Sequence, residues 1–178
     1  MSSATGETIP SWVKHTPILD DYDINWSHTL GTGASGNVRL ASKRSQPDKK
    51  YAVKVLIDTK RARHEIQLHH KLVNTSNHTG VVKLYDVYLN EIKFPGETVP
   101  QSRLLLILEF CAGGELLERL SNLRASQQGL TEKAAAKIIF DIVQILNKLH
   151  DENIAHRDLK LENLLYREID FDYDPYCD

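Results

Sequence analysis

The chain has 178 residues, of which 41% are apolar and 26% are charged, and its formal net charge is −2. This length allows one ordinary domain, and the near-balance of charge gives no electrostatic reason to expect nucleic acid or membrane binding. No apolar run approaches the roughly 20 residues of a membrane span, and the N-terminus lacks the basic and apolar regions of a signal peptide. The two cysteines, Cys111 and Cys177, cannot form a disulfide framework, so we expect an intracellular protein, cytoplasmic or nuclear.

The first part of the chain has the pattern of strands with one helix. Residues 1–20 are polar, contain two prolines and predict a flexible N-terminal extension. Apolar residues that alternate with polar ones predict a strand over 24–30, which resumes at Val38 and Leu40 and is followed by a turn at 45–48. The remaining predicted elements of this part are strands over 51–56, 81–89 and 103–110 and a helix over 59–73.

The pair Gly113-Gly114 ends this pattern, and the chain that follows is predicted to be helical. A short helix is expected over 115–123, and Thr131 is a plausible N-cap for a long helix that ends near His150. The long helix is so apolar that we expect it to be buried around most of its circumference. This order predicts an α+β protein with a strand-rich lobe over 21–110, a helical part over 111–178 and a joint near 109–114.

A glycine-rich segment lies between the first two predicted strands and matches the pattern G-x-G-x-x-G-x-V: Gly31-Thr32-Gly33-Ala34-Ser35-Gly36-Asn37-Val38. Glycines allow the backbone N–H groups to approach phosphates closely. Between two strands the pattern is typical of a kinase, whereas a dinucleotide-binding fingerprint opens a helix. Taken alone, the segment is explained equally well as an ordinary glycine-rich hairpin.

Lys54 follows this segment on the next strand, within Ala52-Val53-Lys54. It shares a strand face with small Ala52 and would reach phosphates beneath the glycine loop. Glu65, on the predicted helix, is the candidate ion-pair partner of Lys54, and a surface glutamate is the alternative. The neighbouring histidines do not make a zinc-hydrolase motif, because Leu68 stands where H-E-x-x-H needs its second histidine.

The strongest motif matches H-R-D-L-x-x-x-N and runs over His156-Arg157-Asp158-Leu159-Lys160-Leu161-Glu162-Asn163. In this pattern Asp158 would accept the hydroxyl proton of the substrate, and Asn163 would hold a Mg²⁺ ion on the phosphates. Lys160 would neutralise charge on the transferring phosphoryl group. The chemistry indicated is phosphoryl transfer.

Together these motifs resemble the eukaryotic protein kinase superfamily. The short step from Lys54 to Glu65 and the segments 60–65 and 153–158 are similar to the MAP-kinase-activated protein kinases, and segments 24–26, 94–95 and 130–133 point to one member of that group. The resemblance runs from about Ile18 to Tyr166. It implies a bilobal kinase fold and transfer of the γ-phosphoryl group of ATP, with Mg²⁺, to serine or threonine of protein substrates.

The resemblance also implies a role for further residues. Leu30 and the glycine loop would cover the ATP, and Leu108 would stand at the back of the adenine pocket. The backbone of Glu109 and of Cys111 would hydrogen-bond the adenine, which would lie between Val38, Ala52 and Leu165. Glu115 would bind ribose or a basic substrate residue, Glu162 would favour the same basic residues, and Arg157 would pair with a phosphorylated activation loop.

The chain departs from the family pattern at three places. Leu161 stands where proline is usual, and Ser35 replaces the usual aromatic residue at the tip of the glycine loop. No D-F-G triplet follows Asn163, so we expect a C-terminally truncated kinase that is inactive alone and lacks the docking tail for an upstream MAP kinase. The alternative is a non-catalytic truncated form that binds a nucleotide or a partner and modulates a kinase pathway.

Overall fold

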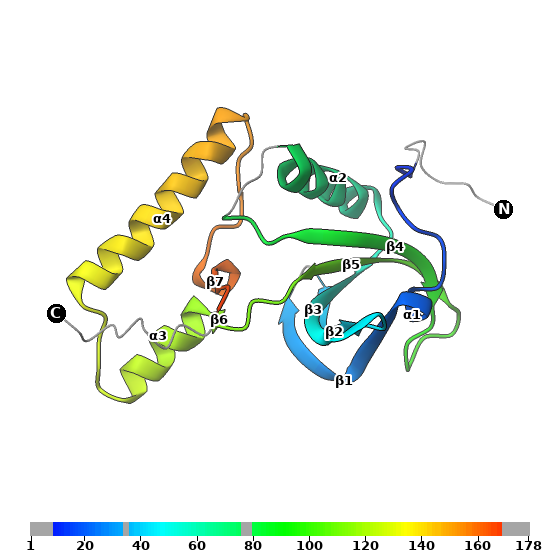
Figure 1. Cartoon of the computed structure of the whole chain (residues 1–178), viewed down its shortest axis with the longest axis horizontal. Helices are drawn as coiled ribbons and strands as arrows, with labels where there is room; N and C mark the ends of the chain where they lie inside the picture. The colour runs from blue at the N-terminus through cyan, green and yellow to red at the C-terminus, as the bar shows by residue number, and fades with distance from the viewer. Residues whose placement is uncertain (1–8, 34–35, 76–79, 169–178) are drawn as a thin grey trace. The chain divides into compact units, whose positions relative to one another are not determined.

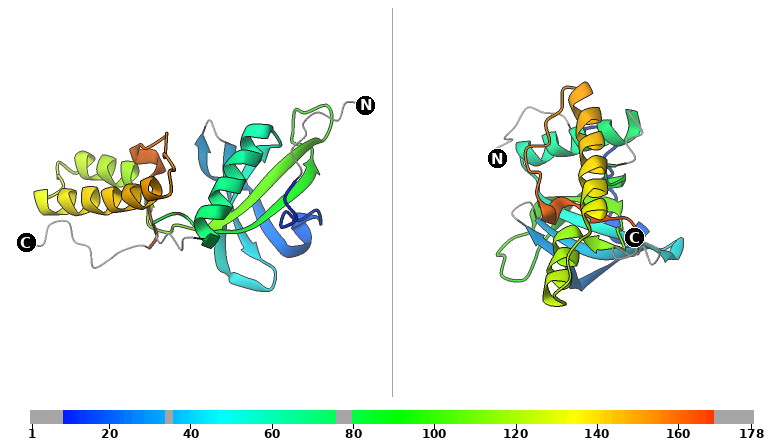
Figure 2. Two further views of the ribbon diagram at one scale, coloured as in Figure 1. Left: turned by 90° about the horizontal axis from the view of Figure 1, so that it is seen from above. Right: turned by 90° about the vertical axis from the view of Figure 1, so that its left-hand side faces the viewer.

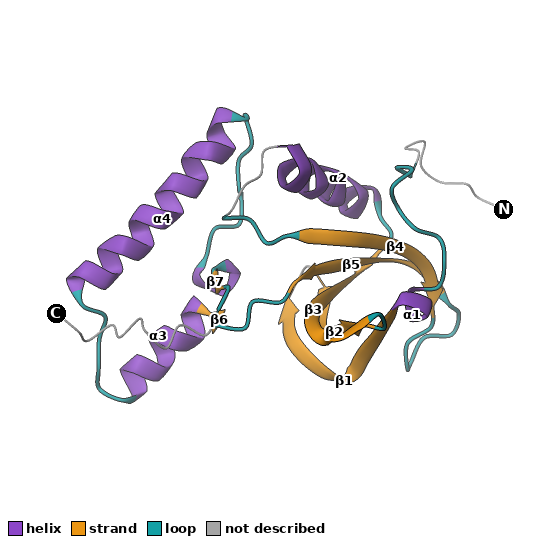
Figure 3. Ribbon diagram, in the orientation of Figure 1, coloured by secondary structure: helices purple, strands orange, loops and turns teal. Residues whose placement is uncertain are grey.

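The computed structural model describes residues 9–33, 36–75 and 80–168. The chain divides into two compact units, residues 1–110 (unit 1) and residues 111–178 (unit 2). Figure 3 shows a strand-built unit 1 and a unit 2 in which helices predominate. An antiparallel sheet with one long helix, followed by a helical part, confirms the predicted α+β fold class.

Unit 1 is built on a five-stranded antiparallel sheet in the order β1-β2-β3-β5-β4 (Figure 1). Its elements in chain order are α1 (Ile18–Asp21), β1 (Tyr22–Gly33), β2 (Gly36–Lys43), β3 (Gln46–Ile57), α2 (Lys60–Thr75), β4 (Leu84–Ile92) and β5 (Gln101–Glu109). The turn expected at 45–48 is shorter than predicted, because Lys43 already pairs with Gln46 and β3 begins there.

Strand β5 lies between two hydrophobic clusters, one on each face of the sheet. Leu105 and Ile107 belong to the cluster that contains Tyr22 and Val53. Leu104 and Leu106 belong to the opposite cluster, which also contains Ile66 of α2. A strand that is buried on both faces is continuously apolar rather than alternating, as residues 104–107 are. Helix α2 therefore covers one face of the sheet, as Figures 1 and 2 show.

The N-terminal segment is packed from Ile9 onward, which corrects the prediction of a flexible extension. Val13 is 4% exposed and Ile18 is 2% exposed. The Lys14 N–H donates to the Val87 carbonyl over 2.8 Å. The correction applies to residues 9–20, where Val13 and Ile18 are buried in spite of their polar context, whereas residues 1–8 lie outside the described part of the chain.

Unit 2 contains β6 (Gly114–Glu115), α3 (Leu116–Ala125), α4 (Glu132–Asp151), the 3-10 turn η1 (Leu161–Asn163) and β7 (Leu165–Tyr166). The predicted cap of α4 is confirmed, since the Thr131 hydroxyl accepts a hydrogen bond from Ala134 N over 3.1 Å. No helix in the described ranges is both long and apolar enough to cross a membrane.

Helix α4 is less buried than its sequence predicts. Ala134 and Leu149 are buried on one side, while Ile139 and Phe140 are each 60% exposed and Val143 is 49% exposed. The prediction that the helix is buried around most of its circumference is therefore wrong. The apolar positions of α4 form two faces, and only one of them is covered by residues that the structure describes.

Candidate functional site

Lys54 and Glu65 form an ion pair within unit 1. The Lys54 Nζ atom lies 2.7 Å from Glu65 Oε1. Lys54 is in the second half of β3 and Glu65 is in the first half of α2, so the pair joins the sheet to the helix that covers it. The two side chains are 20% and 45% exposed, and an ion pair of such exposure contributes only about 0–1 kcal/mol to stability. The geometry of the pair therefore depends on the packing of α2.

Helix α2 is fixed at both ends by polar contacts. At its start, Arg63 donates two hydrogen bonds of 2.6 Å to the carboxylate of Asp58. Toward its end, His69 Nε2 lies 2.8 Å from the Val82 carbonyl oxygen. Burial lowers the pKa of His69, so its ring is neutral at pH 7, and because a carbonyl only accepts, Nε2 carries the proton.

The glycine segment is a hairpin in which Gly33 pairs with Gly36 and Gly31 pairs with Val38. Gly36 has φ +119°, and a Cβ atom there would lie 2.3 Å from the Val55 carbonyl oxygen. Only glycine fits where the hairpin approaches β3 so closely. The structure describes the backbone of Thr32 and of Gly33, and Ala34 and Ser35 lie outside the described residues.

Four predicted nucleotide-binding side chains share the face of the sheet that carries α2. Val38 is the cross-strand partner of Lys54, and Ala52 is the partner of Leu108. Directly paired residues point to the same face, and so do Ala52 and Lys54, which are two positions apart on β3. Leu30 and Asn37 lie on the two strands of the hairpin beside this set.

Glu109, the first residue of the predicted joint, is hydrogen-bonded to the segment before β4. Its backbone N–H donates to the Lys83 carbonyl over 2.9 Å, and its carboxylate accepts from Lys83 N over 3.2 Å. In unit 2 the Cys111 carbonyl accepts from Gly114 N over 3.3 Å, which closes a turn.

Asp158, Lys160 and Asn163 come together in one loop of unit 2. Asn163 Nδ2 donates to the Asp158 backbone carbonyl over 2.7 Å and to Asp158 Oδ2 over 3.0 Å. Lys160 Nζ lies 3.5 Å from the same Oδ2 atom. The left-handed backbone of Arg157, with φ +62°, and the single turn of η1 fold the loop so that Asn163 reaches back to Asp158.

This arrangement keeps the Asp158 carboxylate ionised. The hydrogen bond from Asn163 lowers the pKa of Asp158, and the charge of Lys160 lowers it further. Both hydrogen bonds use Asn163 Nδ2. The Oδ1 atom of Asn163 has no hydrogen-bond partner among the described residues. An amide oxygen is a ligand type that Mg²⁺ accepts, so the donor set fits the predicted metal. The described residues contain no group of three or more His, Cys, Asp or Glu side chains placed to hold a metal ion.

The segment that follows this loop is bonded to the Gly113-Gly114 joint. Strand β6 pairs with β7, so that Glu115 lies opposite Leu165. Gly113 N donates to the Tyr166 carbonyl over 3.0 Å, and a Cβ atom on Gly113 would lie 2.5 Å from Tyr166 Cβ. Glu162 is exposed on η1. The structure thus brings Glu115 and Leu165 together.

Comparison with known proteins identifies the family of this site. Residues 24–171 match the protein kinase domain family. The chain belongs to the protein kinase family. The kinase chain is 41% identical to MAP kinase-activated protein kinase 5 of human and of mouse over 160 residues, which are 90% of this chain and 32% of each relative. It is 39% identical to MAP kinase-activated protein kinase 2 of Drosophila melanogaster over 154 residues, 86% of this chain and 39% of that protein.

The kinase chain therefore spans about a third of the length of the relatives named here, the share being 32% for MAP kinase-activated protein kinase 5. The predicted resemblance to the MAP-kinase-activated protein kinase group is confirmed. Protein kinases in general use ATP and a divalent metal.

Two structural features that position these residues could not be predicted from sequence patterns. The close approach of Gly113 to Tyr166 is set by backbone hydrogen bonds between two-residue strands, which are too short to show a side-chain period. The packing of residues 9–14 on unit 1 was also missed. Its only trace in the sequence is the presence of Ile9, Trp12 and Val13 in a polar stretch.

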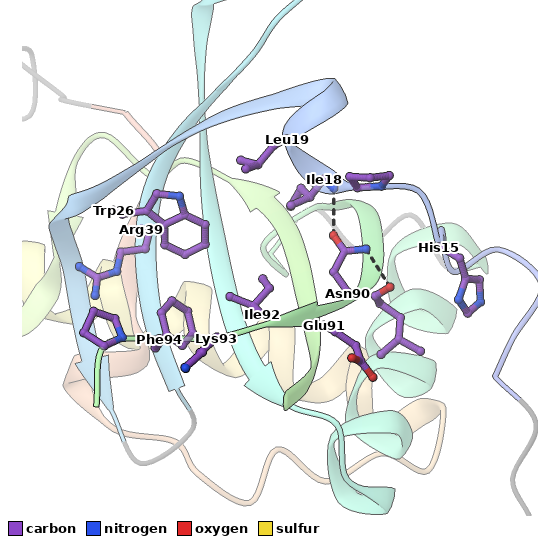
Figure 4. Close-up of a pocket in the computed structure, with 13 residues that line it drawn as sticks. His15, Ile18, Leu19, Trp26, Arg39, Asn90, Glu91, Ile92, Lys93 and Phe94 are labelled. Carbon is purple, nitrogen blue, oxygen red and sulfur yellow. Dashed lines mark hydrogen bonds between the residues drawn. The ribbon is translucent and has the colours of Figure 1, made fainter. Parts of the chain in front are cut away.

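A cavity of about 820 Å³ lies elsewhere in unit 1 of the kinase. Figure 4 shows Trp26 and Phe94 on one side of it and Ile18 and Asn90 on the other. The Asn90 side chain is already used, since its Oδ1 accepts from Ile18 N over 2.9 Å. No residue that the sequence predicts for ATP binding or catalysis lines this cavity.

Proposed function

We propose that this chain carries the phosphate-binding and catalytic-loop residues of a serine/threonine protein kinase of the MAP-kinase-activated type. The observation that supports this proposal is the Asp158 carboxylate, which Asn163 holds by two hydrogen bonds with Lys160 at 3.5 Å. An ionised acid beside a lysine and an amide is the set that transfer of a phosphoryl group to a hydroxyl requires.

The residues of unit 1 bind the phosphates of ATP. Backbone N–H groups of the glycine hairpin contact the phosphate oxygens, and Lys54 contacts the α- and β-phosphates. Glu65 limits the positions that the Lys54 ammonium can take. Val38, Ala52 and Leu108 provide the apolar surface for adenine.

The residues of unit 2 act on the hydroxyl and on the transferred group. Asp158 accepts the proton of the serine or threonine hydroxyl while the hydroxyl oxygen forms a bond to the γ-phosphorus. The bond from that phosphorus to the β-γ bridging oxygen breaks at the same time, and ADP leaves with the bonding electron pair. Lys160 neutralises charge on the transferred group. Mg²⁺ on the phosphates would supply charge neutralisation, and Asn163 is the residue that would hold it.

The kind of substrate is inferred from two acidic residues, and the activating partner is inferred from the names of the relatives. Glu115 and Glu162 would favour protein substrates with basic residues upstream of the phosphorylated site. The names of the relatives support an upstream MAP kinase as the activating partner. Neither the described residues nor the relatives favour the alternative of a non-catalytic protein.

The test of this function is phosphorylation of a serine peptide with upstream arginines by the purified protein. Replacement of the base, Asp158→Asn, is expected to lower the transfer rate by about 10²–10⁴-fold. The affinity for Mg²⁺-ATP is expected to stay the same, because Asp158 acts on the hydroxyl.

Asp141→Asn is the matched control, since Asp141 is an exposed aspartate on α4 that pairs only locally with Lys137. Near-normal transfer by Asp158→Asn would show that the role assigned to Asp158 is wrong.

A further inference from the structure

The segment 9–14 meets the edge of the sheet in unit 1 through one parallel bridge, between Lys14 and Tyr88. Strand β4 is an edge strand, and edge strands leave backbone groups unpaired unless another segment covers them. Lys14 N donates to the Val87 carbonyl over 2.8 Å, and the Lys14 carbonyl accepts from Leu89 N over 2.9 Å. Lys14 Nζ also lies 2.8 Å from Asp86 Oδ1, which fixes the register of the segment on β4.

The same segment contributes to the cluster between the sheet and α2. Val13 is 4% exposed and belongs to the cluster that contains Ala62 and Ile66 of α2 and Val87 of β4. One side chain of the N-terminal segment is thus buried with both the helix and the strand. Ile9 and Trp12 pack at the border of this cluster.

Trp12 also contacts α2 directly. The Trp12 and His70 rings are stacked, with centroids 4.0 Å apart and planes 4° apart. The preceding residue, His69, is bonded to Val82 in the segment before β4. The Trp12 stacking and the His69 hydrogen bond therefore add to the packing of Val73 in holding the second half of α2.

These contacts bear on the nucleotide site because Ile66 and Glu65 are neighbours on α2. Ile66 is 1% exposed and lies in the cluster that Val13 helps to fill. Glu65 is bonded to Lys54 through an exposed ion pair, which is too weak to hold a helix in place. The position of Glu65 is therefore set by the packing of Ile66.

We infer that residues 9–14 form a strap that positions α2, and that Trp12 and Val13 are positioning residues for the Lys54–Glu65 pair. The inference rests on the proposed function, in which Lys54 of that pair binds ATP phosphates. Loss of the strap allows α2 to shift and separates Glu65 from Lys54, although neither Trp12 nor Val13 touches the nucleotide.

The test compares Trp12→Ala with Trp12→Phe, which keeps a stacking ring, and with Trp26→Ala. Trp26 is a matched control because it packs with Phe94 beside the other cluster, away from α2. Trp12→Ala is expected to raise the Kd for Mg²⁺-ATP at least about fivefold, the lower end of typical coupling between sites. Trp12→Phe is expected to restore most of the affinity, and Trp26→Ala to change it by less than about twofold.

A double-mutant cycle with Glu65→Gln separates positioning from general destabilisation. If the strap acts through the pair, Trp12→Ala causes no further loss of affinity once Glu65 is replaced. Losses that multiply in the double variant would overturn the inference, as would an unchanged Kd for Trp12→Ala.

Hydrogen exchange provides a readout that does not depend on nucleotide binding. Faster exchange of the amides of residues 60–75 in Trp12→Ala than in Trp26→Ala supports the strap. Equal exchange in both variants would overturn it. A wild-type chain that does not bind Mg²⁺-ATP contradicts the proposed function, whereas the exchange result still decides the inference.

Discussion

Asn163 has two tasks that use different atoms of one side chain. Its Nδ2 atom donates to the backbone carbonyl and to the carboxylate of Asp158, and in the proposed function its Oδ1 atom would hold the metal. A residue that fixes the base and holds the ion links their positions. An aspartate at position 163 would provide oxygen ligands without the N–H donor and would repel Asp158, which explains why an amide suits this position better than a carboxylate.

The hydrogen bond from Asn163 predicts a change in the titration of Asp158. Asn163→Ala removes the largest cause of the lowered pKa, so we expect the pKa of Asp158 to rise toward the ordinary aspartate value of about 3.9. Titration of the labelled carboxyl carbon by NMR measures this, with exposed Asn147→Ala as the control.

The sign of the pH effect follows from the direction of the shift. A carboxyl group whose pKa is lowered by folding adds stability above its unfolded pKa, and this contribution is lost as the pH falls through the lowered value. Asp158 is 64% exposed, so the change is expected in its titration far more than in global stability. An unchanged pKa in Asn163→Ala would contradict the assigned hydrogen bond.

At the scale of elements, apolar packing outweighs the ion pair that it positions. Complete burial of a side chain such as Val13 or Ile66 is worth about 1.5–3 kcal/mol, whereas the exposed Lys54–Glu65 pair is worth about 0–1 kcal/mol. The helix therefore places Glu65, and Glu65 places Lys54. Core residues that do not contact ATP are therefore expected to affect its binding, because they position α2 and thereby Glu65 and Lys54.

The N-cap of α4 provides a prediction about stability. Thr131→Ala removes the acceptor for Ala134 N and is expected to lower the free energy of unfolding by about 1 kcal/mol. Urea denaturation of the purified chain, followed by circular dichroism, measures this change. Ser121→Ala is the control, since its exposed hydroxyl bonds only the Leu117 carbonyl on the preceding turn. Equal stability of the two variants would show that the cap is not formed in solution.

Local signals explain why many elements could be predicted from the sequence. Helix α4 has an N-cap and a helical apolar period within one segment, and the spacing of Lys54, Glu65, Asp158 and Asn163 identifies the candidate site. The strap and the β6–β7 pair could not be predicted, because each depends on backbone bonds between distant residues. The Lys14–Val87 and Gly113–Tyr166 bonds leave no period in the sequence.

At the scale of the whole molecule, the exposed face of α4 is the feature from which we expect self-association of the chain. Ile139, Phe140 and Val143 lie at helical spacing on one face and are 49–60% exposed. Exposed apolar patches of this kind promote association. We expect the average mass of the purified chain in sedimentation equilibrium to rise with concentration.

Phe140→Asp is expected to reduce this association, because it places a charge in the centre of the apolar face. Lys148→Gln is the matched control, since it changes the net charge by the same amount at an exposed position on the polar side of the same helix. Association that is equally strong in Phe140→Asp and in the wild type would show that this face is not responsible.

A thermal-shift titration of the purified chain with Mg²⁺-ATP, for the wild type and for Lys54→Met, shows whether Lys54 belongs to an ATP site. Exposed Lys71→Met on α2 is the control. A ligand that binds only the folded state stabilises it, by about 2.7 kcal/mol at 100 times the Kd. We therefore expect the transition temperature to rise with Mg²⁺-ATP for the wild type and for Lys71→Met, and to rise little or not at all for Lys54→Met. Equal shifts for Lys54→Met and the wild type, or no shift in any of the three proteins, would contradict the assignment of Lys54 to an ATP site.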